Sequence, residues 1–168
     1  MTFYDILSSP IGNLLMVANE NGLNKILFED ENQLNKIDDT WINDTDRLKE
    51  ISNQLKAYFA KELTEFDLKL APEGTAFQKQ IWKQLQEIPF GEVCSYQDIA
   101  LSINKPNACR AIGMANSLNP IPVIIPCHRV IGKNGKLTGY AGGLETKAKL
   151  LGLENIDLSN SKSQYQLF

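Results

Sequence analysis

Cys127 and His128 stand side by side in the string Pro126-Cys127-His128-Arg129-Val130, and His128 is the chain's only histidine. Sulfur acts as a nucleophile only as a thiolate, and a nearby imidazole is a common means of removing its proton. The pair therefore indicates nucleophilic chemistry at Cys127 with His128 as the base. A buried structural cysteine beside a surface histidine is the alternative interpretation, so the rest of the chain has to decide between them.

The cysteine and histidine counts argue against a disulfide framework and a metal centre. The three cysteines, Cys94, Cys109 and Cys127, are odd in number and widely spaced. A disulfide framework needs paired cysteines, and a zinc site needs several close Cys or His ligands. We expect no metal and no cofactor.

Length and composition indicate an ordinary globular protein. The chain has 168 residues, of which 43% are hydrophobic and 22% charged. No apolar run approaches the roughly 20 residues that span a bilayer, and the first residues lack the features of a signal peptide. We expect a cytoplasmic protein, or a nuclear one in a eukaryote, without a membrane partner.

Charge is unevenly distributed along the chain, whose net charge is −3. Residues 1–70 hold 13 acidic and 7 basic residues, whereas residues 91–140 hold five basic and two acidic ones. The mildly basic second half is compatible with nucleic-acid binding, although a solvated face would look the same.

The first half reads as a scaffold. Strands are expected over Phe3–Leu7, Leu14–Ala18 and Leu23–Phe28, with a hairpin at Asn21-Gly22, which gives a three-stranded antiparallel sheet. A helix from Asp44 or Thr45 to about Lys61 would cover the sheet, and Phe66–Leu70 would add a short strand.

The second half reads as mainly helical. Thr75 is the expected cap of one helix and Ser95 of the next, which runs from Tyr96 to about Ile103. A further helix over 107–117 would complete a helix-turn-helix. The apolar run 121–125 is expected to be a buried strand ahead of Cys127, and a last helix spans 144–153.

The second helix of this pair carries one long charged side chain, Arg110, among small residues such as Ala111 and Gly113. Helices that read base edges offer several long polar residues. A nearly bare helix instead suits a close, sequence-independent approach to a backbone or narrow groove. A tightly packed internal helix would have the same composition.

Four strings in this order, Arg110-Ala111-Ile112-Gly113, Asn119-Pro120, Ile125–Val130 and Gly139–Leu144, resemble the O6-alkylguanine-DNA alkyltransferases in their stand-alone form. Gly91–Tyr96 is similar to the start of the same family's helix-turn-helix. The resemblance implies an α+β protein with an RNase H-like domain over 1–72 and a DNA-binding, alkyl-accepting domain over 73–168.

The resemblance also implies a single-turnover methyltransferase that moves the alkyl group of O6-alkylguanine, and also of O4-alkylthymine, irreversibly onto Cys127. His128 would deprotonate the thiol through a water, Glu154 would orient and charge the imidazole, and Tyr96 would donate to the guanine. A thiolate beside a cationic imidazole is stabilised, so we expect a lowered pKa for Cys127.

DNA contacts follow from the same resemblance. The helix-turn-helix would enter the minor groove of double-stranded DNA, with Arg110 filling the gap left by a flipped base and Ala111, Gly113 and Tyr96 beside it. Five further residues would line or support the pocket: Asn119, Pro126, Val130, Tyr140 and Ala141. Some relatives have serine at position 141, so Ala141 leaves only its backbone amide for O6. A monomer is expected.

Two other functions remain possible from the residues. A non-repairing module that recognises alkylated DNA is known among relatives that replace the cysteine, and the presence of Cys127 argues against it. A Cys-His hydrolase would need an oxyanion hole and would leave Arg110 and the helix-turn-helix unexplained.

Overall fold

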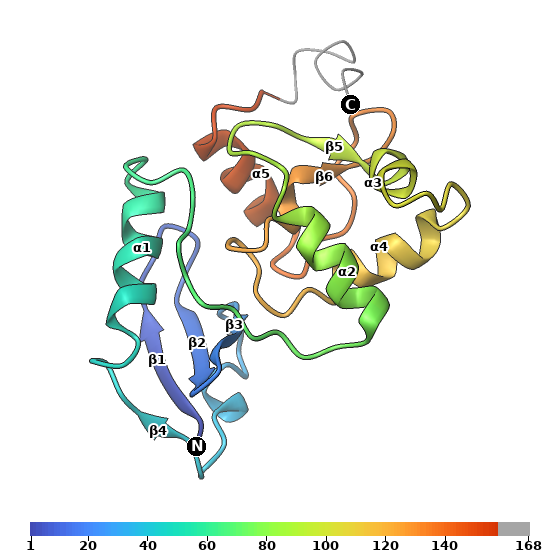
Figure 1. The fold of residues 1–168 in the computed structure, drawn as a ribbon. Helices are drawn as coiled ribbons and strands as arrows, with labels where there is room; N and C mark the ends of the chain where they lie inside the picture. The colour runs from blue at the N-terminus through green and yellow to red at the C-terminus, as the bar shows by residue number, and fades with distance from the viewer. Residues whose placement is uncertain (158–168) are drawn as a thin grey trace. The chain divides into compact units, whose positions relative to one another are not determined.

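The computed structural model describes residues 1–157, and the chain divides between Glu73 and Gly74 into an N-terminal and a C-terminal unit (Figure 1). No helix in this described part is long and apolar enough to cross a membrane. Each unit has its own sheet, and each is described separately below.

The N-terminal unit contains a four-stranded sheet in the order β3-β2-β1-β4. Strands β1 (Phe3–Leu7), β2 (Leu14–Asn19) and β3 (Gly22–Leu27) are antiparallel, as predicted. The prediction of three strands was wrong, because β4 (Ile42–Asn43) pairs in parallel with β1. The Ile42 amide donates to the carbonyl oxygen of Thr2 at 2.9 Å, so a short return of the chain extends the sheet.

The helix of this unit, α1 (Lys49–Phe59), is shorter than predicted, because Asp44 caps a separate turn by accepting from the Arg47 amide at 3.0 Å. Its buried face consists of Ile51, Leu55 and Tyr58. The strand predicted over Phe66–Leu70 is absent from the described structure, where only an isolated bridge joins Leu70 to Leu23. These residues build a core and bring no reactive groups together.

The helices of the C-terminal unit begin where local capping predicts. Thr75 starts α2 (Ala76–Leu85) and Ser95 starts α3 (Tyr96–Ser102), each in a reciprocal capping box with the third helical residue. Helix α4 (Cys109–Ser117) follows α3 after a turn in which Asn104 has a φ of 58°. The indole nitrogen of Trp82 donates to the Ala115 carbonyl oxygen at 2.8 Å, which ties α2 to α4. The helix-turn-helix thus rests on a buried anchor.

Two short strands connect the helix-turn-helix to the segment that carries Cys127. Strands β5 (Cys94–Ser95) and β6 (Val130–Ile131) pair in parallel, with Cys94 opposite Val130 (Figure 1). The last helix, α5 (Leu144–Leu153), buries Lys147, Leu150 and Leu151. The start of α3 is therefore held beside the residues that directly follow Cys127.

The apolar run 121–125 is a series of turns, and the prediction of a strand there was wrong. The Ile125 amide donates to the Ile121 carbonyl oxygen at 2.9 Å, and Val123 has a φ of 73° in the left-handed region. The run is nevertheless buried, with Ile121, Val123 and Ile125 at 0% exposure. A compact buried turn, rather than an extended strand, supports Cys127.

Candidate active site

Cys127 opens a 3-10 turn, Cys127–Arg129, between the buried turns and β6. Its amide donates to the Ile125 carbonyl oxygen at 2.7 Å. The side chain of Asn119 closes the preceding turns by donating to the same carbonyl oxygen at 2.7 Å and accepting from the Ile121 amide at 3.0 Å. Asn119 therefore fixes the backbone directly ahead of the thiol.

Glu154, at the end of α5, bonds the side chains of the two residues that follow Cys127. Its carboxylate lies 2.6 Å from His128 Nε2 and accepts from Arg129 Nε at 2.8 Å and from the Gly91 amide at 3.1 Å. Burial alone would raise the pKa of Glu154, but the hydrogen bonds and charges of His128 and Arg129 outweigh it and bring the pKa to about 2. Glu154 is an anion in a water-poor environment.

His128 is held in one orientation. It is fully buried, and burial lowers its pKa even though Glu154 acts in the opposite direction. Because the ionised Glu154 can only accept, Nε2 carries the proton in the neutral imidazole. Nδ1 then has a free electron pair and makes no hydrogen bond to any atom of the described residues. This nitrogen is available as a base.

The thiol of Cys127 is neutral in the protein without substrate. Burial raises the pKa of Cys127 to about 11, although hydrogen bonding with Asn119 and the charge of Lys147 lower it. The lowered pKa expected from the sequence is therefore wrong for this state. Its premise was a cationic imidazole, whereas burial keeps His128 neutral.

Lys147 is a fully buried cation close to Cys127 that the sequence analysis did not identify. Its Nζ donates to the Val130 carbonyl oxygen at 2.7 Å and to the Thr138 carbonyl oxygen at 3.3 Å. Burial lowers the pKa of Lys147 to about 8, while the proximity of Cys127 acts to raise it. Lys147 bonds neutral oxygens and, within residues 1–157, no carboxylate.

Tyr96, the first residue of α3, faces the same region. Its hydroxyl lies 2.6 Å from Thr138 Oγ1, which in turn lies 3.4 Å from Lys147 Nζ. Burial raises the pKa of Tyr96, so its hydroxyl keeps its proton at neutral pH. A Cβ on Gly113 of α4 would lie 3.9 Å from the Tyr96 ring, which puts Tyr96 against the second helix as well.

The remaining predicted residues separate into a buried and an exposed group. Pro126 and Val130 are buried beside Cys127, Tyr140 is half-buried, and Ala141 is exposed in the loop before α5. Arg110 and Ala111 are exposed in the first turn of α4 and belong to its outer face.

Sequence reasoning missed two charged residues of the site, Arg129 and Lys147. Arg129 lies in the recognised string but was given no role, although its guanidinium bonds both Glu154 and the Ile88 carbonyl oxygen. Lys147 lies in the predicted last helix, and the residues around it in the sequence do not distinguish it from a lysine on the surface. Only the tertiary contact with Val130 reveals its burial.

Known proteins match both units. The family model described as the DNA binding domain of 6-O-methylguanine DNA methyltransferase matches residues 76–156, and its ribonuclease-like domain matches residues 2–72. A methylated-DNA–protein-cysteine methyltransferase of Methanosarcina barkeri is 54% identical over 156 residues, which cover 93% of this chain and 99% of the relative. The constitutive one of Bacillus subtilis is 41% identical over 160 residues, covering 93% and 97%.

A solved structure of a related protein is also similar to this chain in fold and sequence. The crystal structure of Mycobacterium tuberculosis OGT in complex with DNA matches with a TM-score of 0.82 and 44% identity, covering 97% of this chain and 94% of that one.

Proposed function

The chain belongs to the 6-O-methylguanine DNA methyltransferase family, and we propose that Cys127 is the residue that accepts the alkyl group. Its activity is that of a methylated-DNA–protein-cysteine methyltransferase, which reverses DNA damage directly by alkyl transfer to a cysteine. The observation that carries the assignment is that His128 and Arg129, the two residues directly after Cys127, are both buried and both bonded to the buried carboxylate of Glu154. Neither Cys94 nor Cys109 is next to a histidine in the sequence, because His128 is the only histidine of the chain.

Transfer begins with removal of the thiol proton. His128 Nδ1 is the base, reached from Cys127 through a water, and Glu154 compensates the charge of the imidazolium that forms. The thiolate would then form a carbon–sulfur bond with the alkyl carbon while the bond from that carbon to O6 breaks. The electron pair of the broken bond goes to the guanine, and the protein keeps a thioether that has no built-in reversal.

Lys147 supplies an electrostatic reason why a thiolate can form in this buried place. It is a cation whose hydrogen bonds go to neutral oxygens, and its charge lowers the pKa of Cys127. A fixed charge in a water-poor site stabilises a developing anion without reorganisation. The neutral resting thiol would therefore ionise beside a cation that is already in place.

The leaving guanine is a poor anion unless it receives a hydrogen bond or a proton. Tyr96 keeps its proton and lies at the start of the helix-turn-helix, so its hydroxyl is a suitable donor to the base. Ala141 offers only its backbone amide near O6. Pro126, Val130 and Tyr140 would line the remaining pocket.

The DNA surface would be the exposed face of α4. Arg110 is its long side chain, and the neighbouring Ala111 and Gly113 permit a close approach to the minor groove. A buried thiol cannot reach an alkyl group inside stacked DNA, which supports extrusion of the damaged base with Arg110 filling the gap. O4-alkylthymine fits the same chemistry. We infer a monomer that works in the cytoplasm, at the nucleoid in a prokaryote.

Intact mass spectrometry tests the assignment. The protein is incubated with a duplex oligonucleotide containing O6-methylguanine, and we expect one added methyl group per protein, located at Cys127 by peptide mapping. Cys127→Ser should gain nothing, whereas the matched variant Cys109→Ser should react normally. Repeated turnover without a change in protein mass would identify a hydrolase, and tight binding without transfer a recognition module. Either result would overturn the proposal.

A further inference from the structure

The Tyr96 hydroxyl, which the proposed function uses as the donor to the leaving guanine, is itself held by two other side chains. Its oxygen lies 2.6 Å from Oγ1 of Thr138, a half-buried residue of the loop between β6 and α5. Burial raises the pKa of Tyr96, and hydrogen bonding with Thr138 and Asn116 acts in the opposite direction. The alkyl-transfer steps described above use neither Thr138 nor Asn116.

Lys147 sets the direction of the Thr138 hydroxyl. Lys147 Nζ lies 3.4 Å from Thr138 Oγ1 and 3.3 Å from the Thr138 carbonyl oxygen. An ammonium group can only donate, so Thr138 Oγ1 accepts from it and keeps its own single proton. The Tyr96 oxygen is the one other partner of Thr138 Oγ1 within residues 1–157. If Tyr96 were the donor, the Thr138 proton would have no acceptor there, so Thr138 donates to Tyr96.

Asn116 approaches the same oxygen from α4. It is 4% exposed on the buried face of that helix, and its Nδ2 lies 3.5 Å from the Cys127 carbonyl oxygen. Its hydrogen bonding favours the ionised form of Tyr96, which is the effect of a donor. A phenol oxygen that accepts from two donors has only its own O–H left to offer. The Tyr96 O–H is therefore directed away from both Thr138 and Asn116.

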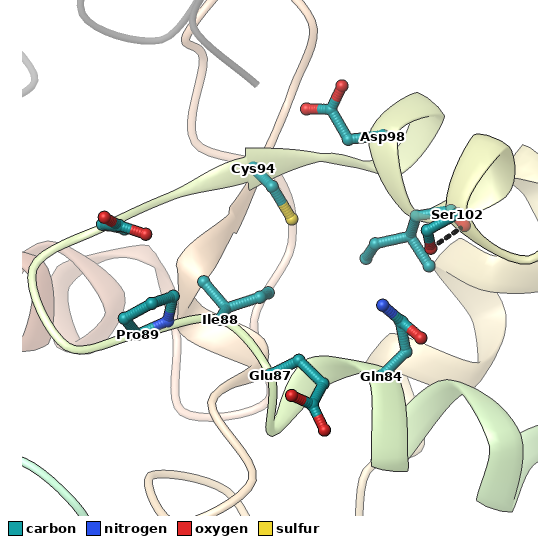
Figure 2. A pocket seen from close by; sticks show the side chains of 9 residues that line it. Gln84, Glu87, Ile88, Pro89, Cys94, Asp98 and Ser102 are labelled. Carbon is teal, nitrogen blue, oxygen red and sulfur yellow. Dashed lines mark hydrogen bonds between the residues drawn. The ribbon is translucent and has the colours of Figure 1, made fainter.

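The backbone of Tyr96 is fixed independently of these side chains. Tyr96 directly follows β5 and begins α3, and Figure 2 shows Cys94 on the strand and Asp98 on the first turn of the helix. Ser95 and Asp98 form the capping box at this step, in which the Ser95 amide donates to Asp98 at 2.8 Å. The contact with Thr138 therefore affects the hydroxyl of Tyr96 rather than the start of the helix.

We propose that Thr138 is a positioning residue for alkyl transfer: its hydroxyl donates to the Tyr96 oxygen and thereby directs the Tyr96 O–H to the leaving guanine. As the bond between the alkyl carbon and O6 breaks, its electron pair goes to the guanine, and the Tyr96 O–H stabilises the charge that develops there. Donation from Thr138 strengthens this hydrogen bond, because hydrogen bonds in a chain polarise one another. The inference rests on the proposed function, since it requires guanine as the leaving group.

Thr138→Val tests the inference, because it removes the hydroxyl and keeps the branched shape of the side chain. We expect single-turnover methyl transfer from O6-methylguanine in duplex DNA to slow about tenfold, the order of one hydrogen bond. Thr138→Ser keeps the hydroxyl and should stay within about threefold of the unmodified protein. Thr146→Val, at a half-buried threonine of α5, is the matched control and should react at the normal rate.

Two further measurements separate positioning of Tyr96 from a general structural role. In a Tyr96→Phe background, Thr138→Val should cause no further slowing, because its effect passes through the missing hydroxyl. Alkylation of Cys127 by iodoacetamide releases iodide and needs no donor to a base. Its rate in Thr138→Val should stay within about twofold of normal, because Lys147 keeps its bonds to carbonyl oxygens beside the thiol.

Three results would overturn the inference: an unchanged rate of methyl transfer in Thr138→Val, a slowing that persists in the Tyr96→Phe background, or an equal slowing of methyl transfer and iodoacetamide alkylation. An unmodified protein that gains no methyl group at Cys127 would instead overturn the proposed function. The mass of the unmodified protein after reaction therefore distinguishes the failure of the function from the failure of the role of Thr138.

Discussion

Arg129 and Glu154 form a two-pronged ion pair, from Nε to Oε1 at 2.8 Å and from Nη2 to Oε2 at 3.2 Å. Arg129 is 6% exposed and Glu154 2% exposed, so either charge alone would be buried without compensation. Because the pair keeps Glu154 ionised, its oxygen can hold the Nε2 proton of His128 throughout. Glu154, which holds the proposed base His128, is therefore itself held by the buried guanidinium of Arg129.

Replacing one partner of this pair should destabilise the protein strongly. We expect Arg129→Met to lower the free energy of unfolding by about 3–5 kcal/mol, because Glu154 is left buried and unpaired. The double variant Arg129→Met/Glu154→Gln should lose less than the sum of the two single losses. Urea denaturation measures both. The exposed ion pair Lys149–Glu145 is the control, and replacing one of its partners should lower the free energy of unfolding by less than about 1 kcal/mol. Additive losses would contradict a coupled pair.

Stability should fall in acid because of Glu154. Its pKa is lowered from 4.5 to about 2 in the folded protein, so the stabilisation is fully present above pH 4.5 and is lost as the pH falls toward 2. The loss is on the order of 3 kcal/mol. Urea midpoints across this range should drop more steeply for the unmodified protein than for Glu154→Gln. Parallel curves would mean that Glu154 is not the titrating group.

Removing the buried cation Lys147 should slow the alkylation of the Cys127 thiol. Lys147 lowers the pKa of Cys127, so Lys147→Met should raise that pKa and slow alkylation of Cys127 by iodoacetamide at neutral pH, about tenfold for each unit. Lys149→Met, on the exposed side of the same helix, should leave the rate unchanged. Equal rates in the two variants would remove Lys147 from the electrostatics of the site.

Arg110 should matter only when the base is inside a duplex. We expect Arg110→Ala to slow repair of O6-methylguanine in double-stranded DNA, while reaction with free O6-benzylguanine continues at its normal rate, because the free base needs no extrusion. Single-turnover kinetics with the two substrates measure the difference. Lys79→Ala, an exposed cation on α2, serves as the control. Equal slowing with both substrates would refute a role in extrusion.

Local chemistry accounts for the parts of the fold that the sequence predicted well. Thr75 and Ser95 begin α2 and α3 as expected, because a cap needs only its own side chain and the next three residues. Strand β4 was missed because it has two residues and depends on pairing with β1, far away in the chain. The run 121–125 shows that apolar composition indicates burial without specifying the backbone, since the side chain of Asn119 closes it into turns.

The candidate site divides in the same way. Cys127 and His128 were identifiable from their residue types, and the recognised motifs led to Glu154 and Tyr96. The pKa of Cys127 was expected in the wrong direction, because it depends on how completely the fold buries the thiol. Lys147 escaped notice because a lysine in a helix is usually exposed, and here the bond to Val130 reverses that preference.

The buried turns around Cys127 carry a consequence for the spent protein. Ile121, Val123 and Ile125 are at 0% exposure, and Cys127 itself is 5% exposed, so the thiol lies next to a closely packed interior. A methyl group left on sulfur has to be accommodated by displaced neighbours, which costs about 1–3 kcal/mol in a well-packed interior. Calorimetry of a partly reacted sample should resolve a second, lower-melting population. Because each protein molecule reacts once, the fraction of protein in this population would equal the fraction that has already removed a lesion.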